Sequence, residues 1–503
     1  MQHIVKSAHC AEIVTCYITY LLAATCYCLL SIALFYVFQK NYDTEGKYPM
    51  SDKTKTNHKQ DRTISALEGK QHARLVELVK FARIYSPYYR ELYQGLPNNV
   101  DSLSQLPITN KKKLMARFDD WVTDPSITLD KVRSFIDDPN LVGEQFLGKY
   151  HVAVTSGTTG SHGIFLTDDS TTAMSAKINK RAKLSWIGIN GLLKLFVRGF
   201  RLAAITATGE HFGFLSGINY MRKTNNFWRK RVRAFSVHMP ILELVSQLNE
   251  FQPTLIMGYA SVVALLASEQ ELGRLYIRPV FVEVMSEKLI DAEFQKIGKV
   301  FKVKPYQMYG STENPFASSI CKHGWYHVNS DVVILEPVDA EYRPVPLGTM
   351  SHTVLITNLV SRIQPIIRYD LGDSIVMRPN ACPCGDPRPA IQVQGRAADA
   401  LVFTASNGEK VMVPPLLFVT LIDRMHGIEL FQIVQTSPTI LRIRLHYAAS
   451  VDQQQQDRQW QILCDELTTM LMGRNLGHIT FERDSESPEQ SQGGKFRMVI
   501  PFE

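Results

Sequence analysis

Hydrophobic and polar positions follow two different periods along the chain, and they alternate between helical and strand-like spacing. Between Ser65 and Tyr93 apolar residues recur at helical spacing, which predicts one or two amphipathic helices broken at Ser86-Pro87. Short β-rich runs then alternate with helical stretches. The predicted strands are Leu255–Met257, Val280–Val284 and Val354–Thr357, and the predicted helices are Ile241–Leu248 and Ser261–Glu271. Such alternation is typical of α/β layering.

Near Gly395 the pattern changes to short strands separated by turns. The predicted strands are Leu401–Phe403, Glu429–Val434 and Leu441–Tyr447. A helix is predicted at Gln459–Met472, and a hairpin-like region follows it. We therefore expect a large α/β domain over residues 63–395 and a small α+β domain over residues 396–503.

The N-terminal region departs from this globular pattern. Residues 13–38 carry no charged side chain, and about 20 apolar residues suffice to span a bilayer. Lysines and arginines are more frequent after this segment than before it, which predicts a membrane anchor with the body in the cytoplasm. A cleaved signal peptide and initiation at Met50 are the alternatives. Residues 39–62 are polar and Lys/Thr-rich, which predicts a flexible tether.

Composition sets further limits. The 503 residues are too many for one small domain, and 55 basic against 48 acidic side chains give a formal charge of only +7. Since no concentrated basic face or nucleic-acid-binding motif is visible, we expect no nucleic-acid partner. Four of the eight cysteines lie in or beside the apolar segment, and a cytoplasmic body should hold no structural disulfide.

A loop rich in glycine and hydroxyl side chains follows a strand-like run. Its glycines let backbone N–H groups close on an anion, and its hydroxyl groups add donors. The loop consists of Thr155, Ser156, Gly157, Thr158, Thr159 and Gly160. This composition predicts a phosphate-binding loop, with a plain solvated turn as the alternative.

Other candidate site residues are spread over the rest of the chain. Residues 309–313 place an aromatic ring, a hydroxyl group and a carboxylate together, suited to a base, a phosphate and Mg²⁺. Asp373 follows a glycine turn and could accept hydrogen bonds from a ribose diol. Arg396 opens the small domain, and Lys495 follows two glycines near the C-terminus.

The order of these motifs resembles the AMP-forming adenylating superfamily, and within it the phenylacetate-CoA ligase branch with the capsule-associated adenylate-forming proteins. The likeness runs from about Leu67 to Ile500. It also includes segments outside the nucleotide motifs: Ala82–Arg90, Leu106–Lys111, Pro253–Ser261, Gln364–Tyr369 and Gly494–Arg497.

The resemblance implies ATP and Mg²⁺ as cofactors and a carboxylic acid as substrate. It assigns the 155–160 loop to the ATP phosphates, and the single residues to separate roles: Tyr309 to adenine, Thr312 to the α-phosphate, Glu313 to Mg²⁺, Asp373 with Arg396 to the ribose, and Lys495 to catalysis. The family implies an acyl-adenylate that is passed to a thiol, with CoA the expected acceptor.

Two departures from the family pattern bear on these roles. The domain hinge, usually Asp or Lys, is Ala398 here, with Asp399 one place later, which weakens the case for thiol transfer. Ser286-Glu287 stands where a Gly-Glu pair usually contacts adenine. A carrier protein, an amine or a hydroxyl is therefore the alternative acceptor, and a non-catalytic nucleotide-binding scaffold at the membrane is the alternative function.

A second constellation contains three cysteines and one histidine: Cys321, His327, Cys382 and Cys384. Thiolate and imidazole ligands in this number suit tetrahedral Zn²⁺. The alternatives are three reduced thiols with a turn histidine, and a site in which His323 replaces His327.

Two further features have open interpretations. His211 is either beside the acyl pocket or a buried structural histidine. The basic run between Arg222 and Arg233 could meet lipid headgroups, CoA phosphates or an acidic carrier protein, or simply face water.

Overall fold

The structure is a computed structural model, and two units are distinguished in it, residues 1–62 and 63–503. The described residues are 53–97, 100, 102–155, 163–208, 211–287, 289, 291–315, 317–396, 401–413, 415–422, 425, 427–448, 450–489 and 497–502. The predicted membrane anchor at 13–38 lies outside them. Within the described ranges, no helix is both long enough and apolar enough to cross a bilayer.

The first described element is helix α2 (Lys53–Tyr85), followed by α3 (Pro87–Leu92). The predicted break at Ser86-Pro87 is confirmed, because Ser86 caps α3 and Pro87 occupies its first turn. Residues 53–62, the last part of the expected flexible tether, are helical. Lys, Gln and Arg are good helix formers, and neither Gly nor Pro interrupts residues 53–68.

A nine-stranded sheet organises the middle of the chain, in the order β14-β15-β10-β9-β8-β7-β6-β4-β5. Strands β4 to β8 pair in parallel, whereas the pairings from β8 to β14 are antiparallel. The strands are β4 (Leu202–Thr206), β5 (Val232–Ser236), β6 (Leu255–Tyr259), β7 (Phe281–Met285), β8 (Tyr306–Tyr309), β9 (Ser318–Ile320), β10 (Tyr326–Val328), β14 (Asp373–Met377) and β15 (Ala390–Arg396). The strands predicted at 255–257 and 280–284 are confirmed as β6 and β7.

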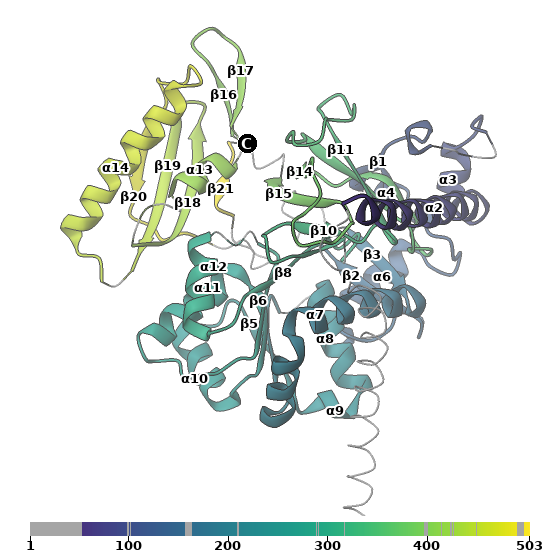
Figure 1. Cartoon of the computed structure of the whole chain (residues 1–503), viewed down its shortest axis with the longest axis horizontal. Coiled ribbons are helices and arrows are strands. Elements are labelled where there is room, and N and C mark those ends of the chain that lie inside the picture. The colour runs from purple at the N-terminus through teal and green to yellow at the C-terminus, as the bar shows by residue number, and fades with distance from the viewer. Residues whose placement is uncertain are drawn as a thin grey trace, which may run out of the picture. The chain divides into compact units, whose positions relative to one another are not determined.

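Helices cover both faces of the parallel part of this sheet (Figure 1). In β4, Ala203 and Ile205 join the core under α10, α11 and α12, while Leu202 and Ala204 join the core beside α8. Strand side chains alternate between faces, so one short apolar strand serves both cores. The helices are α7 (Asp169–Arg198, interrupted at Gly188), α8 (Gly213–Thr224), α9 (Asn226–Arg229), α10 (Ile241–Phe251), α11 (Ala260–Glu271) and α12 (Asp291–Phe301).

A second sheet has the order β1-β13-β12-β11, and strands β2 and β3 form a separate hairpin. These elements share one core with α2, α3 and three short helices. Their bounds are β1 (Thr109–Asn110), α4 (Lys111–Ala116), α5 (Phe118–Trp121), α6 (Leu129–Ile136), β2 (Tyr150–Val154), β3 (Ile164–Asp168), β11 (Val333–Val338), β12 (Thr353–Asn358) and β13 (Ile366–Asp370). The strand predicted at 354–357 is confirmed within β12.

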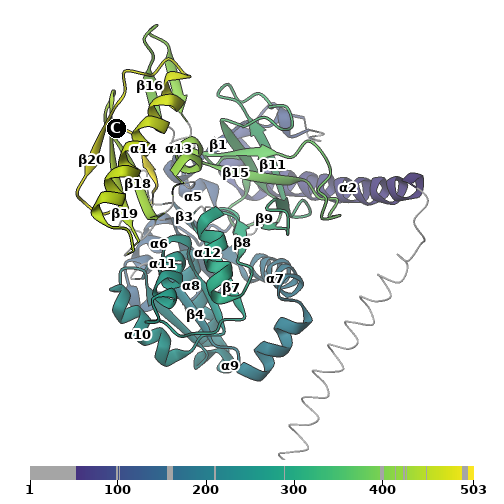
Figure 2. The ribbon, with the colours of Figure 1, turned by 60° about the vertical axis from the view of Figure 1, so that its left-hand side comes forward.

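The described residues from 401 onward build their own core around a four-stranded sheet of order β20-β19-β18-β21 (Figure 2). Leu463, Leu467 and Leu471 of α14 are buried in this core. The elements are β16 (Leu401–Thr404), β17 (Lys410–Val413), α13 (Pro415–Ile422), β18 (Ile428–Ser437), β19 (Ile440–Tyr447), α14 (Gln453–Met472), β20 (Thr480–Asp484) and β21 (Val499–Ile500). The predicted strands and helix are confirmed here, while the domain boundary at residue 396 stays a prediction.

Two details of this region differ from expectation. The last helix begins at Gln453 because Asp452 and Gln455 form a capping box, which the glutamine run alone did not reveal. The terminal strands do not form a hairpin: β20 pairs in parallel with β19, and β21 pairs in parallel with β18 at the other edge. The crossover through α14 brings β20 back parallel to β19.

Candidate active site

A large cleft of about 2290 Å³ collects the described residues that the sequence motifs predict for the nucleotide site. It exceeds the roughly 300–1,000 Å³ of an ordinary small-molecule site, so a nucleotide and a second substrate would fit together. The candidates that line it are Thr155, Tyr309, Thr312, Glu313, Asp373 and Arg396. Residues separated by more than 240 positions in sequence therefore meet in one cavity.

The predicted phosphate loop joins β2 to β3, and its residues 156–160 lie outside the described ranges. Its two ends are fastened to each other: the Thr155 amide donates to the Gly163 carbonyl at 2.9 Å, and the Gly163 amide donates to Thr155 Oγ1 at 2.8 Å. Thr155 thus helps to close the base of the loop in addition to lining the cleft.

Tyr309, Asp373 and Arg396 come from the adjoining ends of β8, β14 and β15. Tyr309 donates a hydrogen bond to Asp373 Oδ2 at 2.9 Å, and Arg396 Nε lies 3.6 Å from Asp373 Oδ1. Burial raises the pKa of Tyr309 well above its ordinary value, and the Asp373 carboxylate raises it further, so the phenol stays protonated as a donor. The side chain is only 8% exposed, and its expected contact with adenine stays a prediction.

Glu313 is held in place from the second sheet. Tyr369 donates a hydrogen bond to Glu313 Oε1 at 2.9 Å, and Asn358 Nδ2 donates to the Glu313 carbonyl at 3.0 Å. The turn before Glu313 requires glycine, because a Cβ at Gly310 would lie 2.4 Å from the Pro315 carbonyl oxygen. The sequence motif therefore encodes a tight turn that directs Thr312 and Glu313 into the cleft.

Lys111 is a cleft residue for which the sequence predicted no role. It begins helix α4, and a Cβ at Gly163 would lie 3.2 Å from its Cδ atom, so its stem passes the base of the phosphate loop. Burial lowers the pKa of Lys111; among nearby charges Glu313 opposes this effect and Arg396 adds to it. Only its place in the family-like segment 106–111 marked it in the sequence.

The position of Lys111 predicts a contribution to ATP binding. We expect Lys111→Met to lower kcat/KM for ATP about 10-fold or more, since a hydrogen bond to a charged group contributes about 1.5–3 kcal/mol. Steady-state kinetics with ATP varied would measure the change. Lys113→Met is the matched control, because Lys113 is exposed and donates to the Ile108 carbonyl outside the cleft. Equal kinetics for the two variants would contradict this role.

The departure at Ser286-Glu287 has a structural consequence. Ser286 adopts φ +68°, a left-handed backbone conformation that favours glycine. The family pattern has glycine at this position. The Glu287 carboxylate accepts a hydrogen bond from the Ser261 amide at 2.9 Å, near the N-terminal end of α11. A carboxylate is favoured at such a helix end, so Glu287 stabilises α11 while both residues line the cleft.

His211 occupies a buried position rather than the cleft wall. It is 2% exposed, packs against Phe135 with ring centroids 5.2 Å apart, and contacts the Asp138 carbonyl at 3.3 Å. Its chain neighbours Phe212 and Gly213 line the cleft instead. Of the two interpretations of His211, this environment favours the structural one.

Several residues of the basic run between residues 222 and 233 pair with neighbouring side chains. Lys223 pairs with Glu144 at 2.7 Å, Arg233 lies 3.7 Å from Glu250, and Arg231 stacks on Phe227 at 4.3 Å. These pairs are exposed and each contributes little to stability. They reduce the charge that the run presents to a partner.

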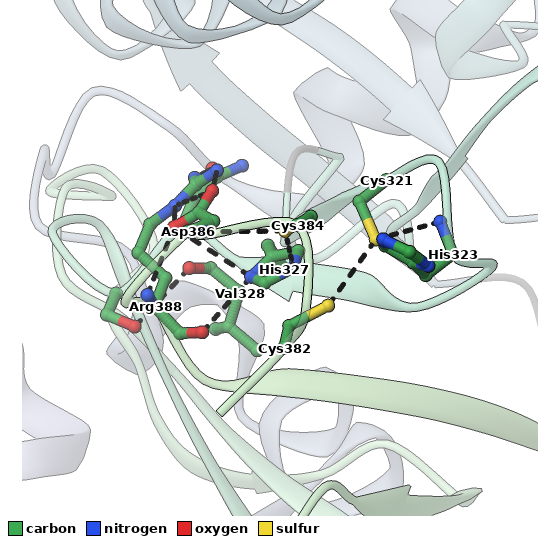
Figure 3. Close-up of polar contacts among 10 residues, drawn as sticks. Cys321, His323, His327, Val328, Cys382, Cys384, Asp386 and Arg388 are labelled. Carbon is green, nitrogen blue, oxygen red and sulfur yellow. Dashed lines mark hydrogen bonds and ion pairs between the residues drawn. The ribbon is translucent and has the colours of Figure 1, made fainter. Parts of the chain in front are cut away.

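The four predicted zinc ligands are brought together from the β9–β10 turn with strand β10 and from the β14–β15 loop (Figure 3). One ligand atom from each of Cys321, His327, Cys382 and Cys384 lies within 4.8 Å of all the others. His327 is 1% exposed and belongs to this group, whereas the alternative ligand His323 is exposed.

No family model matches the chain. Among curated proteins, protein CapK of Staphylococcus aureus is 23% identical over 343 residues, 65% of this chain and 70% of CapK. Among solved structures, 2-hydroxyisobutyryl-CoA ligase with 2-HIB-AMP in the postadenylation state has a TM-score of 0.63 at 20% identity, covering 86% of this chain and 89% of the ligase. The same ligase with 2-HIB-AMP and CoA in the thioesterification state has a TM-score of 0.51, with 87% and 90% covered.

The fold of this chain is therefore similar to that of 2-hydroxyisobutyryl-CoA ligase, in agreement with the resemblance seen in the sequence. The weaker likeness to CapK agrees with the capsule-associated branch of that resemblance.

Proposed function

We propose that the protein is an ATP-dependent, AMP-forming ligase that adenylates an aryl or acyl carboxylic acid and transfers the acyl group to a thiol. One observation carries the proposal: Glu313, Asp373 and Arg396 line a single cleft together with Thr155 at the base of the glycine-rich loop. Arg497, Met498 and Val499 line the same cleft, and they follow Lys495 by only two to four residues.

The first half-reaction follows from this arrangement. An oxygen of the substrate carboxylate forms a bond to the α-phosphorus of ATP, the bond from that phosphorus to the bridging oxygen breaks, and pyrophosphate leaves with the electron pair. Two anions approach each other in this step, so cationic groups lower its barrier. Lys495 and Lys111 would supply positive charge, Thr312 would bind the α-phosphate, and Asp373 with Arg396 would hold the ribose.

Magnesium fits the site because its preferred ligands are oxygen atoms. Glu313 offers a carboxylate that Tyr369 orients at 2.9 Å. A bound Mg²⁺ would neutralise phosphate charge, and the residue that would hold it is Glu313.

Apolar and charged side chains that line the cleft bear on the choice of acid. Met257, Tyr259 and Met285 supply apolar and aromatic surface, while Lys183 and Glu283 form an ion pair at 2.5 Å. The Glu283 side chain is only 3% exposed. An acid with an aromatic or aliphatic body and one polar substituent would complement this lining, as buried polar groups require partners.

CoA is the acceptor that we propose, and a carrier protein, an amine or a hydroxyl is the alternative. The replacement of the usual hinge residue by Ala398 favours the alternative, because domain rotation admits the thiol in the family mechanism. A non-catalytic nucleotide-binding scaffold is a third candidate, which the retained Glu313, Asp373, Arg396 and Lys495 argue against.

Carboxylate-dependent exchange of labelled pyrophosphate into ATP tests the proposal. The panel would contain phenylacetate, benzoate, hydroxy- and amino-substituted forms of each, 2-hydroxyisobutyrate and a fatty acid. We expect at least one acid to support exchange, after which CoA, a carrier protein, an amine or an alcohol is added to identify the acceptor. ATP binding without exchange for any acid would favour the scaffold.

Membrane attachment is part of the proposal and rests on the sequence alone. The uncharged segment at residues 13–38 would anchor the protein, with its catalytic body in the cytoplasm. Deletion of residues 1–50 should move the protein from the membrane pellet to the supernatant in cell fractionation. The same distribution for the full-length and shortened chains would contradict an anchor.

A further inference from the structure

The Cys/His cluster has the spacing of a tetrahedral metal site. Cys321 Sγ and Cys382 Sγ are 3.7 Å apart, and Cys384 Sγ is 3.2 Å from His327 Nε2. Zinc–sulfur bonds of about 2.3 Å in a tetrahedron place two sulfur atoms about 3.8 Å apart. The four ligand atoms therefore need little movement to surround one ion.

The orientation of His327 is set by a hydrogen bond on the side away from the sulfur atoms. His327 Nδ1 lies 3.1 Å from the Arg388 carbonyl oxygen, which can only accept, so Nδ1 carries the proton. Nε2 is then the unprotonated nitrogen, and it faces Cys384 Sγ (Figure 3). Metal-binding histidines commonly donate their second N–H to a carbonyl or carboxylate in this manner.

The Arg388 carbonyl is itself held by a polar network. The Arg388 side chain makes a bidentate pair with Asp386, from Nε to Oδ1 and from Nη2 to Oδ2, and donates to Asn329 Oδ1 at 2.6 Å. The Arg388 amide also donates to Asp386 Oδ1 at 3.0 Å. The loop is therefore ordered around the histidine by groups other than the four ligands.

Backbone amides approach two of the sulfur atoms. The His323 amide donates to Cys321 Sγ at 3.4 Å, and the Asp386 amide donates to Cys384 Sγ at 3.4 Å. Glycine at positive φ follows in both turns, at Gly324 and Gly385, and allows the chain to fold back around the site.

The cluster joins parts of the chain that are distant in sequence. Cys321 and His327 belong to the β9–β10 turn and strand β10, and the other two cysteines lie in the loop between β14 and β15. Strand β10 pairs with the start of β15, through His327 and Ala390, whereas Arg396 lies at the other end of β15. Six residues of strand separate these two ends of β15 by about 20 Å, although Cys321 itself also lines the large cleft.

We propose that Cys321, His327, Cys382 and Cys384 bind one structural Zn²⁺ that fastens the β9–β10 turn to the β14–β15 loop. Sulfur and imidazole donors select zinc over magnesium or calcium. Binding releases the three thiol protons, and four protein ligands complete the tetrahedron and leave no position for substrate. The site stabilises the sheet that carries Tyr309 and Arg396, and it does not depend on the identity of the acid or the acceptor.

Metal analysis of the purified full-length protein tests this proposal. Protein prepared with zinc and a reductant should contain one zinc per chain by mass spectrometry, as should Cys464→Ser, which changes a cysteine of α14 outside the cluster. Cys382→Ser should lose the zinc and unfold at a lower temperature. Replacement of zinc by cobalt in the unmutated protein should give thiolate-to-cobalt charge-transfer bands together with tetrahedral d–d bands.

The cobalt spectrum keeps the test valid if Cys382→Ser fails to fold, because it needs no substitution. Zinc far below stoichiometry in the unmutated protein would overturn the proposal. A Cys321–Cys382 disulfide found by peptide mass spectrometry would overturn it as well, as would a cobalt spectrum without sulfur bands. Loss of adenylation with zinc still bound would bear on the proposed function and leave the metal site intact.

Discussion

Lys495→Ala should lower the rate of carboxylate-dependent ATP–pyrophosphate exchange by about 10²–10³-fold, the usual cost of removing one donor from developing charge. The residues after Lys495, from Arg497 to Val499, line the cleft together with Tyr309 and Asp373. Negative charge builds when the substrate carboxylate approaches the α-phosphate. A lysine that acts on that charge should change kcat far more than KM.

Exchange kinetics with ATP and acid varied in turn would measure both constants. Lys410→Ala is the matched control, because Lys410 is an exposed lysine of β17 and is not among the residues of the cleft. Lys495→Arg would separate charge from shape, since arginine keeps the charge but not the geometry of the ammonium group. A change in KM for ATP with kcat unaltered would show that Lys495 only binds the nucleotide.

Glu313→Gln should lower kcat about 10²-fold or more and raise the Mg²⁺ concentration needed for half-maximal exchange. The substitution keeps the size of the side chain and the acceptor for Tyr369, but it removes the negative charge that favours a hard cation. A magnesium titration at saturating ATP would measure the shift. Glu409→Gln is the matched control, because Glu409 is exposed in the β16–β17 hairpin.

Tyr369→Phe supplies a graded test of the same site. Tyr369 is 2% exposed and donates to Glu313 Oε1. Burial raises the pKa of Tyr369 and the Glu313 carboxylate raises it further, which keeps the phenol a donor. Loss of this hydrogen bond should produce a smaller fall in kcat than Glu313→Gln, with a shift of the magnesium requirement in the same direction. An unchanged magnesium requirement in both variants would contradict the assignment of Glu313.

The predictable parts of this structure are those with strong local patterns. Strands β6, β7 and β12 are apolar runs between turn signals, and helices α10 and α11 have apolar residues at helical spacing. The opposite edges taken by β20 and β21 could not be predicted, because strand pairing depends on residues far away in sequence. The helical state of residues 53–62 was missed because low apolar content was interpreted as flexibility.

The same distinction applies to the candidate site. Family-like motifs located Tyr309, Glu313, Asp373 and Arg396, and all of them line the cleft. Lys111 reaches the site only because the chain fold places it beside Gly163 and near Glu313, about 200 positions later in sequence. No local pattern can report such proximity.

The choice between His323 and His327 likewise required burial and hydrogen-bond geometry. Both histidines lie near Cys321 in sequence, but His327 alone of the two is buried beside Cys384 Sγ. The sequence predicted His327 as the ligand and left His323 as the alternative.

The central claim is that a carboxylate oxygen attacks the α-phosphorus of ATP, and oxygen-18 tests it most directly. An acid that supports exchange would be labelled in its carboxyl group and incubated with ATP, Mg²⁺ and an acceptor, and the products would be analysed by mass spectrometry. We predict AMP that carries one labelled oxygen, together with unlabelled pyrophosphate. Labelled orthophosphate with ADP, or AMP without label, would contradict the account.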